Sequence, residues 1–348
     1  MGGERTLSER ELNRALLARQ LLLERKRLSL PKALERIGGI QAQYAPSMYI
    51  GLWSRVEGFE RDQLTRALER RKVAQGTSLR ATIHLLTPAD WWAFTIAIRE
   101  RRRETWVRYH RDGPSAEQMV AAARRVRKRL AEGPVDRKEL AGMIGFGPQG
   151  VTGITLWLDL VRVPPSGTWE RRRADRFGDA AAWLGAPPDL SRGEATLALV
   201  RSYLRGFGPA AAHEIADWGG LSLEATRLAI GKLELRSFRS EDGTELVDLP
   251  RMPLPDPETP APPRFLPIWD STLLVHARRS QILPEDHRDK VFGTKTPQSV
   301  PTFLVDGRVA GTWRYENGRV ELSPFPPMAR TENPGVEAEE KRLAALHA

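Results

Sequence analysis

The 348-residue sequence contains no cysteine. This absence excludes disulfides, thiolate zinc sites, iron–sulfur clusters and a cysteine nucleophile. No apolar run approaches the ~20 residues that a membrane-spanning helix requires. The first residues, MGGERTLSERELNR, are charged and lack the apolar core of a signal peptide. We therefore expect a cytoplasmic protein with no membrane partner, long enough for two or three domains.

Lysine is also scarce, because only nine of the 54 basic residues are lysine and the other 45 are arginine. The formal net charge of +10 indicates a polyanionic partner, with nucleic acid the first expectation. The arginine bias has two explanations: GC-rich codon usage, or selection for the guanidinium fork that binds phosphate. Charge therefore favours nucleic-acid binding but indicates no chemistry beyond it.

The first 250 residues form three consecutive units, each with helices followed by a β-hairpin. Capping boxes, in which a serine precedes a glutamate or glutamine by three residues, predict helices that begin after Ser8, Ser115 and Ser191. Alternation of apolar and polar residues predicts hairpins within 73–87, 161–177 and 235–249. Helices followed by a two-stranded wing are typical of winged helices. We therefore expect winged-helix units over residues 1–112, 113–190 and 191–250.

The remainder of the chain has a different character. Residues 250–267 hold eight prolines and predict a stiff linker, placed at 251–263. Strand-like runs with Asp-Gly and Asn-Gly turns then predict a small β domain over 264–348, with a final helix over 336–345. The whole is predicted to be a mainly α chain with β wings, an α+β fold.

The segment 38–53, GGIQAQYAPSMYIGLW, is predicted to be the tight joint of a helix-turn-helix. Gly38 and Gly39 turn the chain after an apolar helix, and Pro46 begins the next helix where no amide donor is needed. Gln41 and Gln43 would then lie at the mouth of the motif, where DNA usually binds. Composition alone would make Gln-Ala-Gln an ordinary polar patch.

The order of these segments resembles the winged-helix DNA glycosylases of the AlkZ type, over nearly the whole chain. The resemblance rests on GGIQAQYAPSMYIGLWSRV (38–56), SLRATIHLLTPADWW (78–92), RFLPIWDSTLLVHARRS (264–280) and VDGRVAGTWR (305–314). It implies three tandem winged helices and a C-terminal β-barrel-like domain around a concave DNA channel. The family's catalytic signature is Gln-x-Gln in one branch and Gln-x-Asp in another. Gln41 and Gln43 place this chain in the Gln-x-Gln branch, which is associated with bulky lesions and interstrand crosslinks.

The resemblance makes Gln41 and Gln43 the catalytic candidates, with Tyr44 and Ser47 as neighbouring DNA contacts or supports. Glutamine is a poor base, but a purine alkylated at N7 is cationic and leaves the sugar as a neutral group. The enzyme then has to hold one water and stabilise an oxocarbenium-like sugar, which amide dipoles can do. No lysine lies in the motif, so we expect a monofunctional glycosylase without a Schiff-base step.

Three further candidates lie beyond the Gln-x-Gln segment. Arg80, Thr82 and His84 alternate with apolar residues, which predicts that they share one strand face. They would line the channel as DNA contacts or supports of the site, or else the wing packs on its own domain. A metal role for His84 is not expected, since the histidines show no ligand spacing and cysteine is absent.

Two charged groups allow both a structural and a functional interpretation. Asp270 and Arg279, in an Asp-x8-Arg arrangement, are expected to form a buried ion pair or to support the site. The run Arg171, Arg172 and Arg173 either grips phosphates as part of a wing or lies on a solvated hairpin.

The sequence therefore predicts a DNA glycosylase for N7-alkylated purines that uses no cofactor and no metal. Its partner would be double-stranded DNA carrying alkylated purines or crosslinks, bound by a monomer associated with the nucleoid. Two alternatives remain open: a winged-helix transcription regulator, and a DNA-binding protein that lacks the chemistry.

Overall fold

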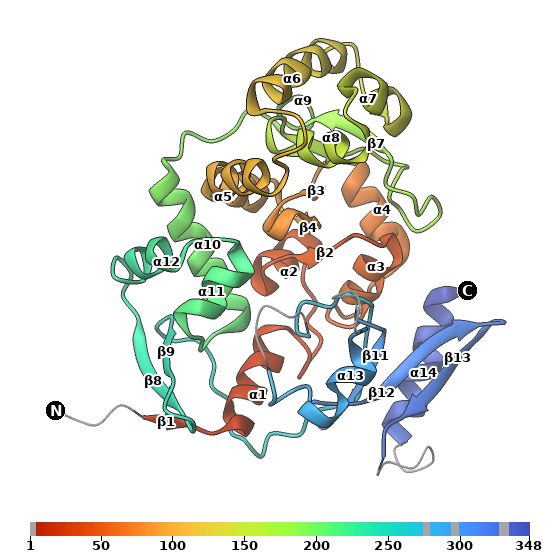
Figure 1. Cartoon of the computed structure of the whole chain (residues 1–348). Coiled ribbons are helices and arrows are strands. Elements are labelled where there is room, and N and C mark those ends of the chain that lie inside the picture. Colours follow the sequence, from red (N-terminus) through yellow and green to blue (C-terminus); the bar gives the residue numbers. More distant parts are fainter. Residues whose placement is uncertain (1–4, 274–278, 294–298, 327–333) are drawn as a thin grey trace.

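The computed structural model describes residues 5–273, 279–293, 299–326 and 334–348 (Figure 1). It is a mixed α/β structure that contains helices and three separate sheets. Residues 274–278, inside one of the quoted motifs, lie outside the described residues. None of the helices in the described ranges combines the length and apolar character needed to cross a lipid bilayer.

Local signals explain where the first helices begin and end. Both halves of the predicted capping box are present at Ser8, before α1. The next helix ends at Gly38, whose φ of 79° is left-handed and therefore suits glycine. Pro46 lies in the first turn of the helix after that, as predicted. The elements of this region are β1 (Thr6–Leu7), α1 (Glu9–Arg19), α2 (Leu30–Ile37), β2 (Ile40–Gln41), α3 (Ala45–Trp53), α4 (Arg61–Glu69), β3 (Ala74–Thr77), the 3-10 turn η1 (Leu79–Ala81), β4 (Ile83–Leu86) and α5 (Pro88–Tyr109).

In the second region, as in the first, helices come before a hairpin along the chain. The predicted capping box at Ser115 is formed with Gln118, and Asp136 caps a shorter helix through its side chain. Its elements are α6 (Ala116–Leu130), β5 (Val135–Asp136), α7 (Arg137–Ile144), α8 (Gly147–Gly153), η2 (Ile154–Leu156), β6 (Leu160–Arg162), β7 (Arg176–Asp179) and α9 (Ala180–Leu184).

The hairpins of the first two regions do not stand apart as separate wings. Strands β3 and β6 pair through Gly76 and Val161, which gives one six-stranded sheet in the order β2-β4-β3-β6-β7-β5. A Cβ atom at Gly76 would lie 2.6 Å from Nε1 of Trp91, so glycine allows this close approach. The predicted hairpins are confirmed; the assignment of three winged-helix units stays a prediction.

The third region packs against the N-terminal helix. It contains α10 (Arg192–Phe207), α11 (Ala212–Gly219), α12 (Leu223–Ile230), β8 (Arg236–Ser240) and β9 (Glu245–Asp248). The predicted hairpin forms, and β1 adds to it in parallel beside β8. Arg19 on α1 and Asp248 on β9 form a fully buried ion pair, with Nη1 to Oδ1 at 2.6 Å. Helix α1 is thereby joined to residues more than 200 positions away.

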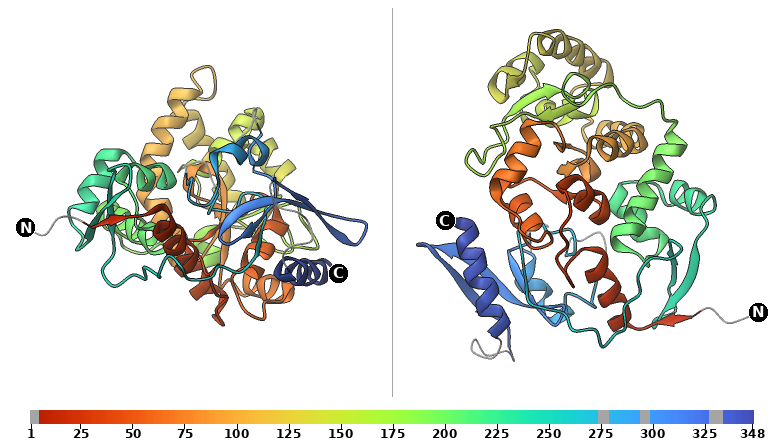
Figure 2. Two further views of the ribbon diagram at one scale, coloured as in Figure 1. Left: turned by 90° about the horizontal axis from the view of Figure 1, so that it is seen from below. Right: turned by 180° about the vertical axis from the view of Figure 1, so that it is seen from behind.

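The C-terminal region contains an open sheet, which corrects the expectation of a barrel. Strands β10 (Arg264–Leu266), β11 (Thr302–Val305), β12 (Arg308–Glu316) and β13 (Arg319–Pro324) form an antiparallel sheet in that order, and its end strands do not pair within the described residues. Four strands, one of three residues, are too few to close around a core. Helix α14 (Pro334–His347) lies along this sheet (Figure 2), while η3 (Glu285–His287) and α13 (Arg288–Val291) precede β11.

Candidate active site

Strand β2 brings Gln41 into the six-stranded sheet, directly opposite His84 of β4. The Gln41 side chain is 5% exposed, whereas Gln43 comes just after the strand and is exposed. Nε2 of Gln41 donates a hydrogen bond to Oε1 of Gln43. The two amides are therefore in direct contact, with Gln41 on the protein side and Gln43 toward solvent. The joint predicted between two helices includes this short strand.

Arg80 holds the other end of the Gln41 amide. Its Nη2 donates to Oε1 of Gln41 at 3.2 Å, and its Nη1 donates to the carbonyl oxygen of Trp218 at 2.6 Å. Burial lowers the pKa of Arg80 to about 10, so the guanidinium remains charged at neutral pH. Both polar atoms of the Gln41 side chain thus have a partner, which fixes the orientation of the amide.

The expectation that Arg80, Thr82 and His84 share one strand face is wrong. Arg80 lies in the turn η1 with a φ of 52°, and Ser78 N donates to Thr82 O at 3.0 Å to close that turn before β4 begins. Alternation alone could not distinguish this turn from a strand. The structure nevertheless brings Arg80 and His84 to Gln41, one by hydrogen bonding and one by strand pairing.

His84 is held as a neutral imidazole. Burial, and then the charge of Arg80, lower the pKa of His84 to about 3. Its Nδ1 lies 3.1 Å from the carbonyl oxygen of Thr82, and the Thr82 hydroxyl donates to Leu79 O at 3.1 Å. A neutral His84 cannot protonate a leaving base near neutral pH, so acid catalysis is not available from this side chain.

Tyr44 and Ser47 lie at the start of α3, beside the two glutamines. Tyr44 is 40% exposed, and its hydroxyl is 3.2 Å from Nη1 of Arg172. Ser47 is buried, and its hydroxyl has no hydrogen-bond partner among the described residues. The contact with Arg172 brings the loop between β6 and β7 next to the Gln-x-Gln segment.

The arginine run of that loop is exposed. Arg171, Arg172 and Arg173 all face solvent, and Arg172 also lies over the ring of Trp169 at 5.9 Å. Arg173 makes an ion pair with Asp175 at 3.5 Å. Their position near Tyr44 suits a role in gripping phosphate, and that role stays a prediction.

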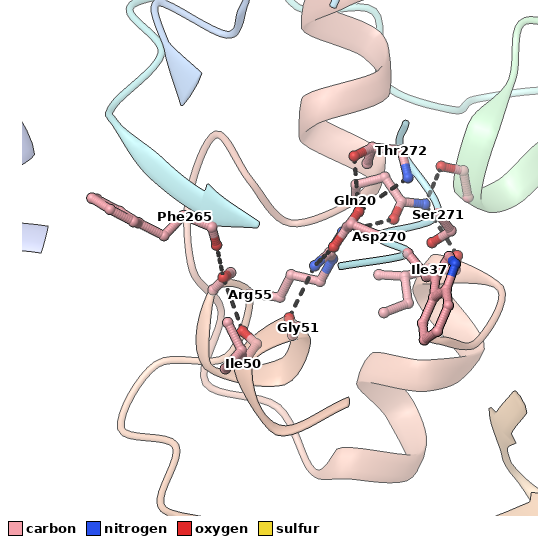
Figure 3. Close-up of polar contacts among 12 residues, drawn as sticks. Gln20, Ile37, Ile50, Gly51, Arg55, Phe265, Asp270, Ser271 and Thr272 are labelled. Atoms are coloured by element: carbon pink, nitrogen blue, oxygen red, sulfur yellow. Dashed lines mark hydrogen bonds and ion pairs between the residues drawn. The ribbon is translucent and has the colours of Figure 1, made fainter. Parts of the chain in front are cut away.

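Asp270 and Arg279 are both buried, but the predicted pair between them is wrong. Asp270 instead forms a bidentate pair with Arg55, at 2.8 and 2.9 Å, as Figure 3 shows. Arg279 donates to the carbonyl oxygens of Ser271 and Thr272, each at 3.1 Å. The expected burial of both residues is confirmed, but Arg55 lies 215 positions from Asp270 and offers no local signal.

The Asp270 pair joins the C-terminal region to the end of α3, the helix that comes after the glutamines. Arg55 Nη1 also donates to Gly51 O at 3.0 Å, within α3. Burial alone would raise the pKa of Asp270, but the Arg55 charge and hydrogen bonds outweigh it and hold the pKa below its usual value. The described ranges contain no group of three or more His, Asp or Glu side chains suited to a metal ion.

Other neighbours of the site had no recognisable sequence signal. Trp218 contributes only its backbone carbonyl, 138 positions from Arg80. Gln75 is buried and donates from Nε2 to Ala42 O at 3.3 Å, which supports the backbone between the two glutamines. The arrangement offers one exposed amide, one fixed amide and a cation, with no group that could act as a strong base.

Comparisons with known proteins identify the family to which the chain belongs. The chain belongs to the family of AlkZ-like DNA glycosylases, since the family model described as "DNA glycosylase AlkZ-like" matches residues 34–346. The protein is therefore a DNA glycosylase. A relative from Streptomyces sahachiroi, the "Interstrand DNA cross-link repair glycosylase", is 24% identical over 376 aligned positions that cover 94% of this chain and 93% of the relative. The solved "Streptomyces sahachiroi DNA glycosylase AlkZ" has a TM-score of 0.80 at 20% identity, covering 98% of this chain and 96% of that one, which shows a common fold.

Proposed function

We propose that the protein is a monofunctional glycosylase that hydrolyses the N-glycosidic bond of N7-alkylated purines in double-stranded DNA. The observation that carries the proposal is the hydrogen-bonded pair Gln41 and Gln43, with Gln41 oriented by Arg80. The second part of the proposal is that the same reaction at one guanine of a crosslink through guanine N7 atoms releases that base from its strand and so unhooks the two strands. The relative named for interstrand crosslink repair supports this part.

The chemistry requires little from the protein. An N7-alkylpurine carries a positive charge, so cleavage of the bond to C1′ releases a neutral base and leaves positive charge on the sugar. A water then adds to C1′ and loses a proton. An amide carbonyl can accept a hydrogen bond from that water and can stabilise the developing positive charge by its dipole.

The geometry suggests different parts for the two glutamines. Gln43 is exposed and would hold the attacking water, whereas the buried Gln41 orients Gln43 through the hydrogen bond from its Nε2. The neutral His84 agrees with a reaction that needs no acid for the leaving base. The two side chains hydrogen-bonded to Gln41 are Gln43 and Arg80. Neither is a lysine, which agrees with a reaction that proceeds without a Schiff base.

The test uses a duplex with a single N7-methylguanine. Incubation followed by heating in alkali should break the strand at the lesion, whereas omission of the alkali treatment should leave the strand intact. Gln41→Ala and Gln43→Ala should each reduce single-turnover excision by about 10- to 1000-fold. Gln63→Ala is the matched control, since Gln63 lies on α4 and its side chain makes a long hydrogen bond, 3.4 Å, to Gly58 O.

Excision at the wild-type rate by both alanine variants would contradict the assignment of Gln41 and Gln43 as catalytic residues. Strand breakage without alkali would show a lyase in place of a monofunctional enzyme. Crosslink unhooking is tested separately with a duplex joined through guanine N7 atoms, by the appearance of single strands on a denaturing gel. A protein that binds these duplexes but excises nothing would be a DNA-binding protein or a regulator.

A further inference from the structure

A pocket lined in part by Arg80 lies close to the candidate active site. Its volume is about 410 Å³, within the range of ligand sites, and it is formed by η1, the C-terminal half of α5 and α11. Arg80 lines this pocket while its Nη2 donates to Oε1 of Gln41. Arg80 therefore contacts both the pocket and the candidate active site. Its lining includes three arginines and three ring-bearing residues: Arg80, Arg101, Arg102, Trp106, Tyr109 and His110.

The arginines of this pocket make no ion pair with any described residue. No carboxylate lies within ion-pair distance of Arg80, Arg101 or Arg102 in the part of the chain that the structure describes. Arg102 Nη1 donates to Ser78 O at 2.7 Å, and its Nη2 is buried with no hydrogen-bond partner among the described residues. A carboxylate in the lining, Asp217, is exposed and pairs with none of them.

Uncompensated cations in a pocket are costly unless an anion binds there. Burial lowers the pKa of Arg102 to about 10, so it keeps its charge at neutral pH and remains without a counter-ion in the described ranges. A phosphodiester provides a single negative charge and acceptor oxygens that match the guanidinium fork. DNA, the substrate of the family, carries this group at every nucleotide.

The rim of the pocket carries an aromatic residue in an unusual position. Tyr109 is 79% exposed at the end of α5, and that end of the helix projects beyond its neighbours in the left view of Figure 2. Behind it, Trp106 and His110 stack at 4.6 Å with an interplanar angle of 17°. An exposed ring beside a cationic pocket is the usual combination for holding a backbone phosphate and an unstacked base.

We propose that this pocket binds one DNA backbone phosphate next to the lesion, through Arg101 and Arg102, with the adjoining base against Tyr109. Because Arg80 contacts both this pocket and Gln41, the bound phosphate fixes the strand relative to the amide pair. The proposal requires DNA as substrate but not N7-alkylpurine as the lesion, so it can fail or hold independently of the proposed function.

The test measures affinity for two duplexes that need no excision: an undamaged one, and one with a tetrahydrofuran abasic site. Arg101→Gln and Arg102→Gln should each weaken binding by about 10-fold. Each should also reduce the magnitude of the log–log salt slope, by up to about 0.9, the value for one phosphate contact. Arg108→Gln is the matched control, since Arg108 is exposed on α5 but does not line the pocket.

A scan with methylphosphonate linkages, each of which removes the charge of one phosphate, identifies the contact. At one linkage near the abasic site, the neutral linkage should weaken the wild type about 10-fold and weaken each variant clearly less, because one of the two arginine contacts is already absent. Equal losses in wild type and variants at every linkage would overturn the proposal. So would an Arg108→Gln effect as large as that of Arg101→Gln. Arg101 is exposed, so its variant keeps the test valid even if Arg102→Gln does not fold.

Discussion

Replacing Arg80 by methionine should reduce excision by loosening Gln41, without removing any atom that touches the substrate at the amide pair. The lost contact to Oε1 of Gln41 is 3.2 Å long and charge-assisted. Such hydrogen bonds contribute about 1.5–3 kcal/mol. Because this one is long, we take the lower value of about 1.5 kcal/mol, which corresponds to a loss of roughly 10-fold in rate.

The effect on stability should be moderate and should not unfold the protein. Arg80→Met leaves the carbonyl oxygen of Trp218 without its 2.6 Å donor, which costs about 1–3 kcal/mol. The same change removes a largely buried charge that has no carboxylate partner in the described ranges, and this gain offsets part of the cost. Thermal unfolding should therefore show a folded variant.

The assay is single-turnover excision of N7-methylguanine at saturating enzyme, which separates the chemical step from DNA affinity. If Arg80 acts through Gln41, the double variant with Gln41→Ala should be no slower than Gln41→Ala alone. Arg80→Lys keeps the charge but not the fork, so it should recover only part of the rate. Multiplicative losses in the double variant would refute the positioning role and give Arg80 an independent contribution.

Three other predictions concern the amide pair and the buried charges. Gln43→Asp adds an anion beside the developing cation and a base for the water, so it should retain excision of small N7-alkyl lesions. An inactive Gln43→Asp protein that still binds DNA would contradict this. Asp270→Ala leaves Arg55 charged and buried, so it should lower the free energy of unfolding, measured in urea, by about 3–5 kcal/mol. A measured loss below about 1 kcal/mol would contradict this prediction. The free energy of unfolding should keep its full value well above pH 4.5, the ordinary pKa of glutamate, and should decrease as the pH falls below that value. The reason is that cationic partners hold the folded-state pKa values of two carboxyl groups below their usual values. These are Arg25 and Arg342 for Glu339 on α14, and Arg55 for Asp270. Urea midpoints that do not change between about pH 6 and 3 would refute this.

Features set by neighbouring residues can be predicted from the sequence. The capping boxes at Ser8, Ser115 and Ser191 are all formed, because each depends on residues three positions apart. The hairpins are equally predictable, since Asp-Gly turns and alternation are local. The proximity of Gln41 and Gln43 follows from their spacing, although their direct hydrogen bond could not be foreseen.

Features set by contacts between distant residues could not be predicted. The burial of Asp270 agrees with expectation, yet its partner is Arg55 on a different region of the chain. The junction of β3 with β6 depends on a single register position, Gly76 with Val161, that no periodicity marks. The alternation of polar and apolar residues predicts a strand at Arg80, where the chain in fact turns. The left-handed backbone of a residue other than glycine cannot be recognised from such a pattern.

The attachment of α1 to the third region has a consequence for the order of events during synthesis. Arg19 and Asp248 are separated by 229 residues, which a ribosome adds in roughly 10 to 50 s. Until then, the guanidinium of Arg19 and the apolar side of α1 lack the surface that buries them. The strand that carries Gln41 is synthesised early in this interval, before Arg80, which binds the Gln41 amide, and long before Trp218, which binds Arg80. A nascent chain can therefore hold the Gln-x-Gln segment long before it holds the oriented amide, and premature arrest before β9 would leave a basic, apolar fragment prone to aggregation.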